Sequence, residues 1–272
     1  MATNYDKYIY STGTHYISNS GQDENKAYHG GKAGDQSGHE WELKAWYSRP
    51  WSVVLRYPNQ AVALTIARLS IGAALNDNIG YDQYQRETYW QALQGANYDP
   101  SAITTACEED CTAGVSANVR AAGYLCGVAA LQSVPICTSR NMRQAFVNAG
   151  FQALTASRFL NGGEYLLPGD VLLYEDHHAA VNVTCGGAVI GQWHPGDIQA
   201  PTASVQSPRV VASGSVYIRK GPDTSYESMG VLPAGQRLRW FGYVAPNGWL
   251  LVEYHRATGW VSGRYARVED AS

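Results

Sequence analysis

The sequence is poor in charge of either sign and has no long apolar run. Only 16% of its 272 residues are charged, and 23 acidic against 20 basic side chains leave a net charge of −3. Such a balance offers no basic field for nucleic acid, so we expect no nucleic-acid partner. No apolar segment approaches the roughly 18–20 residues of a membrane span, so we expect no membrane insertion. The first 20 residues lack a basic region followed by an apolar one, which predicts that no secretory signal is present.

Cysteine is also scarce, at five residues: Cys107, Cys111, Cys126, Cys137 and Cys185. An odd number in a chain of this length does not predict a disulfide framework and indicates synthesis in a reducing compartment. A zinc site is the alternative, since Cys107 and Cys111 lie four positions apart and His177 is next to His178. However, the chain has no CxxC pair and no HExxH motif, so we expect no metal and no cofactor.

What the sequence does contain is typical of a packed globular protein in two parts. Hydrophobic residues make up 45%, and 28 glycines indicate many turns. Residues 1–208 carry 12 basic and 18 acidic side chains, whereas residues 209–272 carry 8 and 5. The polar segment 196–208 (GDIQAPTASVQSP) has the composition of a linker. We therefore expect a catalytic domain over 1–198, a linker over 199–208 and a small domain over 209–272.

The small domain has the pattern of short strands. Apolar strand positions are separated by turn signals at 221–222, 233–235, 247–248 and 258–259, which predicts a small β-barrel. The apolar positions are Val216, Ile218, Val231, Leu238, Trp240, Leu250, Val252, Trp260 and Val261.

The larger part mixes both periodicities. We expect helices at 60–75, 82–93, 112–125 and 140–148, the last with Ser139 as its N-cap. Strands are expected at 14–19, 53–55, 170–173, 179–183 and 188–192. Because helices cluster in the middle and strands at the two ends, the fold class is α+β.

One cysteine has the position of a nucleophile. Cys111 stands at the predicted start of a helix, where unpaired N–H groups and the helix dipole favour a thiolate. The same N–H groups could hold an oxyanion. We interpret the other four cysteines as structural.

A nucleophilic cysteine needs a base and a group that orients it. His178 stands at the start of a predicted strand and is the expected base, whereas His177 is expected in a solvated loop. Spacing alone leaves four candidates for the third group: Asn19, Asn182, Gln192 and His194.

These residues resemble a known family. Segment 110–115 (DCTAGV) resembles the Asp-Cys-Ser-Gly-Leu-Val signature of NlpC-type cell-wall peptidases, which have a papain-like fold. Segments 169–173 (GDVLL) and 178–181 (HAAV) resemble their Gly-Asp strand and their His-Val-Gly-Ile strand. The resemblance implies that Cys111 is the nucleophile and His178 the base, with Thr112 replacing the usual serine.

A second resemblance covers most of the larger part. Segments 30–41 (GGKAGDQSGHEW), 46–51 (WYSRPW), 54–56 (VLR) and 78–83 (NIGYDQ), followed by Arg86, resemble endolysins from phages and prophages of Gram-positive bacteria. Related endolysins carry His-Ala-Ser-Ile-Asp-Glu-Asn where this chain has 19–25 (NSGQDEN). The resemblance thus implies Asn19 as the third catalytic residue, with Gln192 in reserve. This strand would precede the catalytic histidine instead of following it, which implies a permuted order of elements.

The small domain resembles bacterial SH3-like domains. The matching segments are 216–223 (VYIRKGPD), 247–249 (NGW) and 259–262 (GWVS). Such domains commonly hold wall peptide or another wall polymer, which implies a wall-binding tail; a barrel without a ligand is the alternative.

The resemblances together imply an endolysin: a papain-like, NlpC-type and permuted catalytic domain, followed by an all-β SH3-like barrel. The expected reaction is cleavage of a wall-peptide amide, of the γ-D-glutamyl-diamino acid endopeptidase type, with peptidoglycan as partner. The alternatives are an N-acetylmuramoyl-L-alanine amidase, an acyl transferase with the same site, and an inactive wall-binding protein. We expect synthesis in the host cytoplasm and action on the wall after the membrane is opened.

Three further residues are expected to contact substrate. They are Tyr81, Asp35 and Gln36, of which Asp35 and Gln36 have a second interpretation, as residues that hold a turn.

Overall fold

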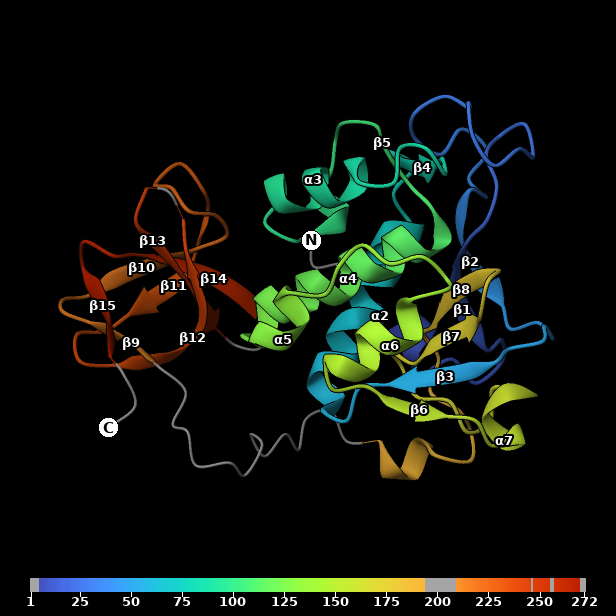
Figure 1. The fold of residues 1–272 in the computed structure, drawn as a ribbon. Coiled ribbons are helices and arrows are strands. Elements are labelled where there is room, and N and C mark those ends of the chain that lie inside the picture. Colours follow the sequence, from blue (N-terminus) through green and yellow to red (C-terminus); the bar gives the residue numbers. More distant parts are fainter. Residues whose placement is uncertain (1–4, 194–208, 246, 255–256, 270–272) are drawn as a thin grey trace. The chain divides into compact units, whose positions relative to one another are not determined.

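The structure is a computed structural model that describes residues 5–193, 209–245, 247–254 and 257–269 (Figure 1). The chain divides into two compact units. One comprises residues 1–123 and 128–199, and the other residues 200–272 together with 124–127. The expected linker at 199–208 lies outside the described residues.

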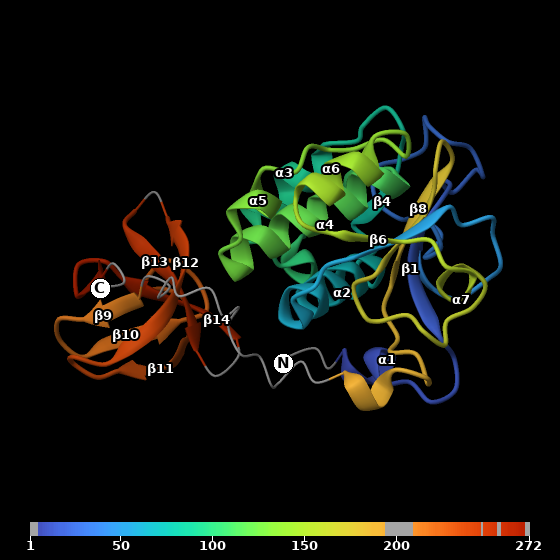
Figure 2. The same ribbon diagram turned by 60° about the horizontal axis from the view of Figure 1, so that its bottom comes forward.

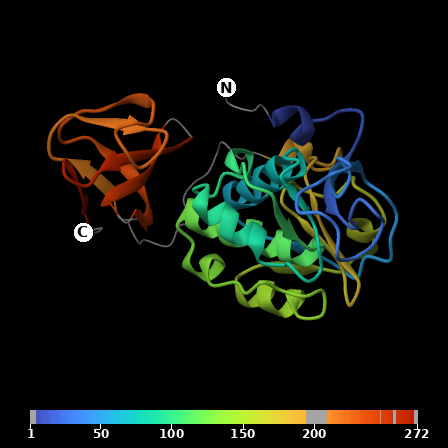
Figure 3. The same cartoon turned by 90° about the horizontal axis from the view of Figure 1, so that it is seen from above.

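A six-stranded antiparallel sheet forms the frame of the first unit. Its strands are β1 (Tyr16–Ser20), β2 (Trp41–Ala45), β3 (Val53–Arg56), β6 (Gln152–Leu154), β7 (Val171–Tyr174) and β8 (His178–Asn182). Their order in the sheet is β2-β1-β8-β7-β3-β6. Figure 3 shows the consequence: the blue N-terminal segment and the yellow strands from the end of the unit lie in the same region. Strand β8 therefore brings residues near 180 next to residues near 18.

Five helices gather on one side of this sheet (Figure 2). They are α2 (Gln60–Ala74), α3 (Thr88–Gly95), α4 (Cys111–Cys126), α5 (Ala129–Gln132) and α6 (Met142–Asn148). The short helices α1 (Asp6–Ile9) and α7 (Ser157–Leu160) lie apart from this group, and the 3-10 turns are η1 (Pro100–Ala102) and η2 (Ile190–Gln192). Helix α2 begins at Asn59, whose side chain accepts hydrogen bonds from the N–H groups of Ala61 and Val62. It packs against β1 and β2, so an apolar helix covers the strand that carries Asn19.

The expected helices at 60–75 and 112–125 are confirmed by α2 and α4. The helix expected at 82–93 is shorter. Asp82 accepts hydrogen bonds from the N–H groups of Gly30 and Tyr84, and this holds the segment before α3 as a turn. The expected Ser139 cap is wrong: α6 begins at Met142, preceded by Asn141.

The strand expected at 188–192 is also wrong, because the 3-10 turn η2 occupies its end. Conversely, the sequence did not predict a separate parallel pair, β4 (Ile79–Tyr81) and β5 (Cys107–Glu109). Because parallel strands end at the same edge, β4 leads to Tyr81 and β5 leads to Asp110 and Cys111 at one place.

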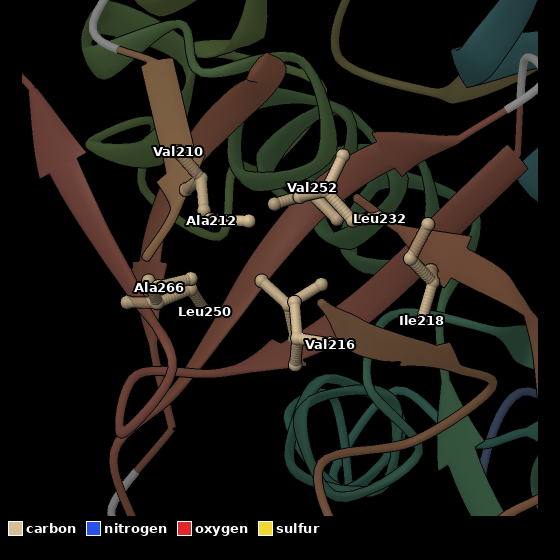
Figure 4. Packing of buried hydrophobic residues seen from close by; sticks show 9 residues of the cluster. Val210, Ala212, Val216, Ile218, Leu232, Leu250, Val252 and Ala266 are labelled. Atoms are coloured by element: carbon tan, nitrogen blue, oxygen red, sulfur yellow. The ribbon is translucent and has the colours of Figure 1, made fainter. Parts of the chain in front are cut away.

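The second unit is a sheet of seven strands. They are β9 (Arg209–Ala212), β10 (Val216–Arg219), β11 (Ser228–Leu232), β12 (Arg237–Val244), β13 (Trp249–Tyr254), β14 (Ala257–Ser262) and β15 (Ala266–Glu269), in the order β11-β10-β14-β13-β12-β9-β15. Figure 4 shows its core, in which apolar side chains from several strands meet. The core residues are Val210, Ala212, Val216, Ile218, Leu232, Leu250, Val252, Val261 and Ala266.

Val231 lies in the strand β11, as expected, although 45% of its surface is exposed. One detail of the predicted barrel is wrong. The signal at 258–259 is not a turn, because Thr258 and Gly259 pair with Glu253 and Val252 inside the β13–β14 ladder. Gly259 is required there by packing, since a Cβ atom would lie 2.5 Å from Cγ2 of Ile218. No described helix has the length and apolar character needed to cross a membrane.

Candidate active site

Cys111 is the first residue of α4, directly after β5. The helix is capped by Asp110, whose Oδ1 accepts hydrogen bonds from the N–H groups of Thr112 at 2.9 Å and Ala113 at 2.8 Å. The next N–H group, of Gly114, donates to Oε2 of Glu109 at 3.0 Å. Three N–H groups that we expected to be open to an oxyanion are therefore already bound by carboxylates.

Arg86 fixes this helix start. Its guanidinium forms an ion pair with Asp110 and donates to the hydroxyl of Thr112 at 3.0 Å. It also donates to the carbonyl of Cys137, so one side chain ties the cap to a separate loop. Because the cap is held on two sides, the Cys111 backbone has a defined direction.

The Cys111 thiol is buried, with 8% of the residue exposed. Its sulfur receives a hydrogen bond from the backbone N–H of Ala179, the residue after His178. Burial, followed by the charge of Asp110, raises the pKa of Cys111 to about 12. The expectation of a lowered thiol pKa is therefore wrong for this structure, because desolvation outweighs the helix start.

His178 is the first residue of β8 and is 7% exposed. Its Nε2 lies 2.9 Å from Oδ1 of Asn19 on the neighbouring strand β1. A carbonyl oxygen only accepts, so Nε2 carries the hydrogen and Nδ1 is the basic nitrogen. Burial, followed by the charge of Arg49, lowers the pKa of His178 to about 3. Cysteine and histidine are thus both neutral at pH 7 in this structure.

Asn19 is itself held in place. The hydroxyl of Tyr47 donates to Oδ1 of Asn19 at 3.0 Å, and the residue is 8% exposed. The ring of Trp51 lies against the imidazole of His178, with centroids 6.1 Å apart and planes at 29°. The structure therefore brings Cys111, His178 and Asn19 to one place, with the histidine fixed from two directions.

The other candidates for the third group lie elsewhere. Oδ1 of Asn182 accepts a hydrogen bond from Nε2 of His15 at 2.6 Å, and Nδ2 of Asn182 donates to the carbonyls of Leu167 and Thr184, at the opposite end of β8. Gln192 is the last residue of η2. His194 lies outside the described residues. His177 is exposed, and its ring lies 4.2 Å from that of Tyr174.

The three expected substrate contacts divide into two kinds. Asp35 accepts hydrogen bonds from the N–H groups of Ser37, His39, Glu40 and Trp41, which matches its interpretation as a turn residue. The amide of Gln36 likewise donates to the carbonyls of Ala33 and Gly34.

Tyr81, the third expected contact, is different from these two turn residues. It is buried close to Cys111, and burial and the neighbouring thiol raise its pKa well above the ordinary value.

A group of buried acidic residues lies next to the site, and two of them, Glu108 and Glu109, are on the strand β5 that leads to Cys111. Glu40 and Glu108 are 0% and 2% exposed, and burial raises their pKa values to about 7 and about 8. Glu109 is 1% exposed and accepts from the hydroxyl of Ser20, and burial raises its pKa as well.

In the described part of the chain, no group of three or more His, Cys, Asp or Glu side chains has the arrangement of a metal site. All five cysteines are free thiols.

Sequence reasoning missed several residues that shape this site. Tyr47, Arg49 and Trp51 all come from segment 46–51, which had been noted only as a pattern shared with endolysins. Arg86 belonged to the same pattern. Three aromatic residues and an arginine in six positions were the available signal, but the side chains that they contact depend on strand pairing.

Comparisons with known proteins give a family for each of the two units. The profile of the endolysin-like domain family matches residues 17–189, which span β1 to the segment after β8. The chain belongs to this family. Residues 214–266 match the bacterial SH3 domain family, so the second unit carries a bacterial SH3 domain.

A further similarity is to a protein of Bacillus subtilis (strain 168) named "Putative N-acetylmuramoyl-L-alanine amidase YrvJ". The two are 41% identical over 69 residues. This stretch is 25% of the present chain and 13% of the relative, so the chain spans a small part of that relative's length.

Proposed function

We propose that the protein is a cysteine-dependent peptidoglycan hydrolase whose SH3 domain holds it on the wall. The observation that carries the proposal is the hydrogen bond between Nε2 of His178 and Oδ1 of Asn19, at 2.9 Å. It lies beside the start of α4, where the sulfur of Cys111 accepts a hydrogen bond from the N–H of Ala179. Membership of the endolysin-like family and the SH3 domain support the substrate class. A papain-like arrangement with a permuted strand order is the fold that we propose for the first unit.

The reaction begins with the Cys111 thiol and the His178 imidazole both neutral. As Sγ of Cys111 attacks the carbonyl carbon, Nδ1 of His178 takes the thiol proton, so the charge pair forms during attack. Asn19 keeps the hydrogen of Nε2 engaged and fixes the ring. The imidazolium then gives its proton to the leaving amine, and a thioester remains on Cys111. His178 next takes a proton from water as the water attacks the thioester. The bond between carbon and Sγ then breaks, the acid leaves, and the imidazolium returns its proton to Cys111.

The oxyanion needs donors that the helix cap has not taken. In the described part of the chain, the N–H of Cys111 has no acceptor, unlike those of Thr112, Ala113 and Gly114. We assign it as one donor. The hydroxyl of Tyr81 accepts from Gln83 at 3.0 Å, so its own hydrogen remains to be donated. We propose Tyr81 as the second contact to the reacting carbonyl.

Two peptidoglycan bonds are candidates for the bond that is cleaved. The γ-D-glutamyl-diamino acid bond is our first proposal, and the name of the Bacillus subtilis relative supports the N-acetylmuramoyl-L-alanine bond as the second. Mass spectrometry of fragments released from purified peptidoglycan decides between them, because an amidase frees intact stem peptides from the glycan. Release of no fragment by the wild-type protein, at any enzyme concentration, would refute hydrolysis.

A further inference from the structure

Arg49 stands beside the catalytic histidine and has no role in the reaction described above. It belongs to a tight turn in which the N–H of Trp51 donates to the carbonyl of Arg49 at 2.6 Å across Pro50. The proline ring fixes one backbone angle of this turn. The turn places Trp51 against His178 and the Arg49 guanidinium 5.7 Å from the centre of the Tyr47 ring. Arg49 is therefore held at a fixed place on the rim of the site.

Among the described residues, the cations next to the site other than Arg49 have carboxylate partners. Lys44, which also approaches the Tyr47 ring, forms an ion pair with Glu42 at 2.9 Å. Asp110 is matched by Arg86. In the part of the chain that the structure describes, Arg49 forms neither an ion pair nor a side-chain hydrogen bond. Arg49 is half-buried, so its guanidinium can meet an anionic group of a bound substrate.

The position also has an effect on His178. Arg49 lies two residues before Trp51, whose ring stacks on His178, and its charge helps to lower the pKa of the imidazole. A carboxylate bound to Arg49 would offset this charge and ease formation of the imidazolium during the reaction. The planar guanidinium suits two parallel hydrogen bonds to a carboxylate better than any other side chain does.

We propose that Arg49 binds a free carboxylate of the substrate, namely the α-carboxylate of the D-isoglutamyl residue in the wall stem peptide. The inference rests on the proposed function and narrows its substrate. That residue carries the γ-acyl group of the γ-D-glutamyl bond, so its α-carboxylate lies a few bonds from the attacked carbonyl. The enzyme would then discriminate between stem peptides with isoglutamate and those with the uncharged isoglutamine.

The test uses the full-length enzyme and two stem peptides that differ only in carboxylate or carboxamide at this residue. For the wild type, we expect kcat/KM to be roughly 10- to 100-fold higher for the carboxylate peptide, the range of a charge-assisted hydrogen bond. Arg49→Gln should bring the two peptides within about threefold of each other, and Arg49→Lys should restore part of the difference. Lys44→Gln is the matched control and should keep the wild-type ratio, because Lys44 is exposed and already paired.

A binding measurement separates this inference from the proposed function. The Cys111→Ala protein is titrated calorimetrically with both peptides, with and without Arg49→Gln. Tighter binding of the carboxylate peptide, lost with Arg49→Gln, supports the inference whether or not cleavage occurs. Equal affinity for both peptides, or a preference that survives Arg49→Gln, overturns it. Failure of the wild type to cleave either peptide, with the binding preference present, overturns the proposed reaction and leaves the carboxylate site standing.

Discussion

The Cys111 thiol is the group whose removal tests the reaction most directly. Because the proposed route passes through a thioester on this sulfur, Cys111→Ala should lower the rate of wall hydrolysis by roughly three orders of magnitude or more. The readout is clearing of a wall suspension and release of new amino groups, with the melting temperature measured in parallel.

Cys107→Ala is the control for this prediction. Cys107 is also buried, and its thiol lies 3.6 Å from the carbonyl of Asn78, at the other end of the short strand β5. We expect it to keep most of the activity with a modest loss of stability. The reverse pattern, an active Cys111→Ala and an inactive Cys107→Ala, would show that the nucleophile is misassigned.

Asn19 should matter less than Cys111, because it forms no bond to the substrate. Asn19→Ala removes the acceptor from Nε2 of His178 and leaves the Tyr47 hydroxyl without its partner. We expect kcat to fall roughly 10- to 100-fold with a smaller change in KM, as is typical of loss of an orienting partner. Tyr47→Phe tests the same chain one bond further out and should have a weaker effect. Full activity of Asn19→Ala at an unchanged melting temperature would mean that another group orients His178.

At the scale of elements, the loop 35–41 and the β4–β5 pair share buried carboxyl groups whose pKa values lie above the ordinary 4.5, at about 7 for Glu40 and about 8 for Glu108. Besides burial, the carboxylates of Asp35 and Glu24 act on Glu40, and those of Glu40, Asp82 and Glu24 act on Glu108. The folded protein thus keeps protons that the unfolded chain releases above pH 4.5. Stability from these groups is therefore present at low pH and is lost as the pH rises through about 7 and about 8.

We expect Glu108→Gln to flatten this pH dependence. A glutamine carbonyl still accepts the hydrogen bond from the N–H of Gly34, but it has no proton to lose. The melting temperature of the variant should exceed that of the wild type at about pH 8.5, and the two should converge at about pH 5.5. A constant difference between the two proteins across this range would show that Glu108 does not titrate there.

The same elements show how far sequence reasoning reaches. Helices α2 and α4 were predictable because fifteen or more residues of apolar, small-residue pattern fix their type locally. Strands β4 and β5 have three residues each and exist only because they pair across 28 positions, which no local pattern records. The segment before α3 was mistaken for helix because its structure depends on the distant N–H of Gly30.

The site divides in the same way. Cys111 and His178 stand in local signatures, so the sequence alone was enough to make them candidates. Asn19 could be inferred only from a resemblance, because its meeting with His178 depends on the pairing of β1 with β8, 159 positions away. The resting protonation state could not be read from the motif, since burial decides it and burial is a property of the folded chain.

At the scale of the whole molecule, the two units have separate cores, so their activities should be separable. Residues 205–272 made alone should sediment with cell walls, whereas residues 1–200 should cleave soluble stem peptides normally and intact walls poorly, because tethering raises the local concentration of bonds. Sedimentation at low and high salt gives the type of binding. Binding through attraction to anionic wall polymers should weaken at high salt, because salt screens charges over a Debye length of roughly 8 Å already at physiological ionic strength. Binding through specific recognition of wall peptide should persist at high salt.

The comparison also tests the role of the SH3 domain. If the fragment 205–272 remains in solution at low salt, the domain does not target the wall. If residues 1–200 lyse intact walls as fast as the full chain, tethering contributes nothing to the rate.

The position of β8 in the sheet determines when the proposed site can first assemble. Strand β8 is the last strand of the first unit to leave the ribosome, and it joins β2-β1 on one side to β7-β3-β6 on the other. Until β8 is inserted, β1 and β7 lack the strand that pairs with both of them, and Asn19 lacks its hydrogen-bond partner His178. Closure over so long a stretch of chain makes folding slow and late. A nascent or truncated chain that ends before residue 178 therefore carries a cysteine at a helix start without the proposed base, so the completion of the sheet and the assembly of the proposed site are one event.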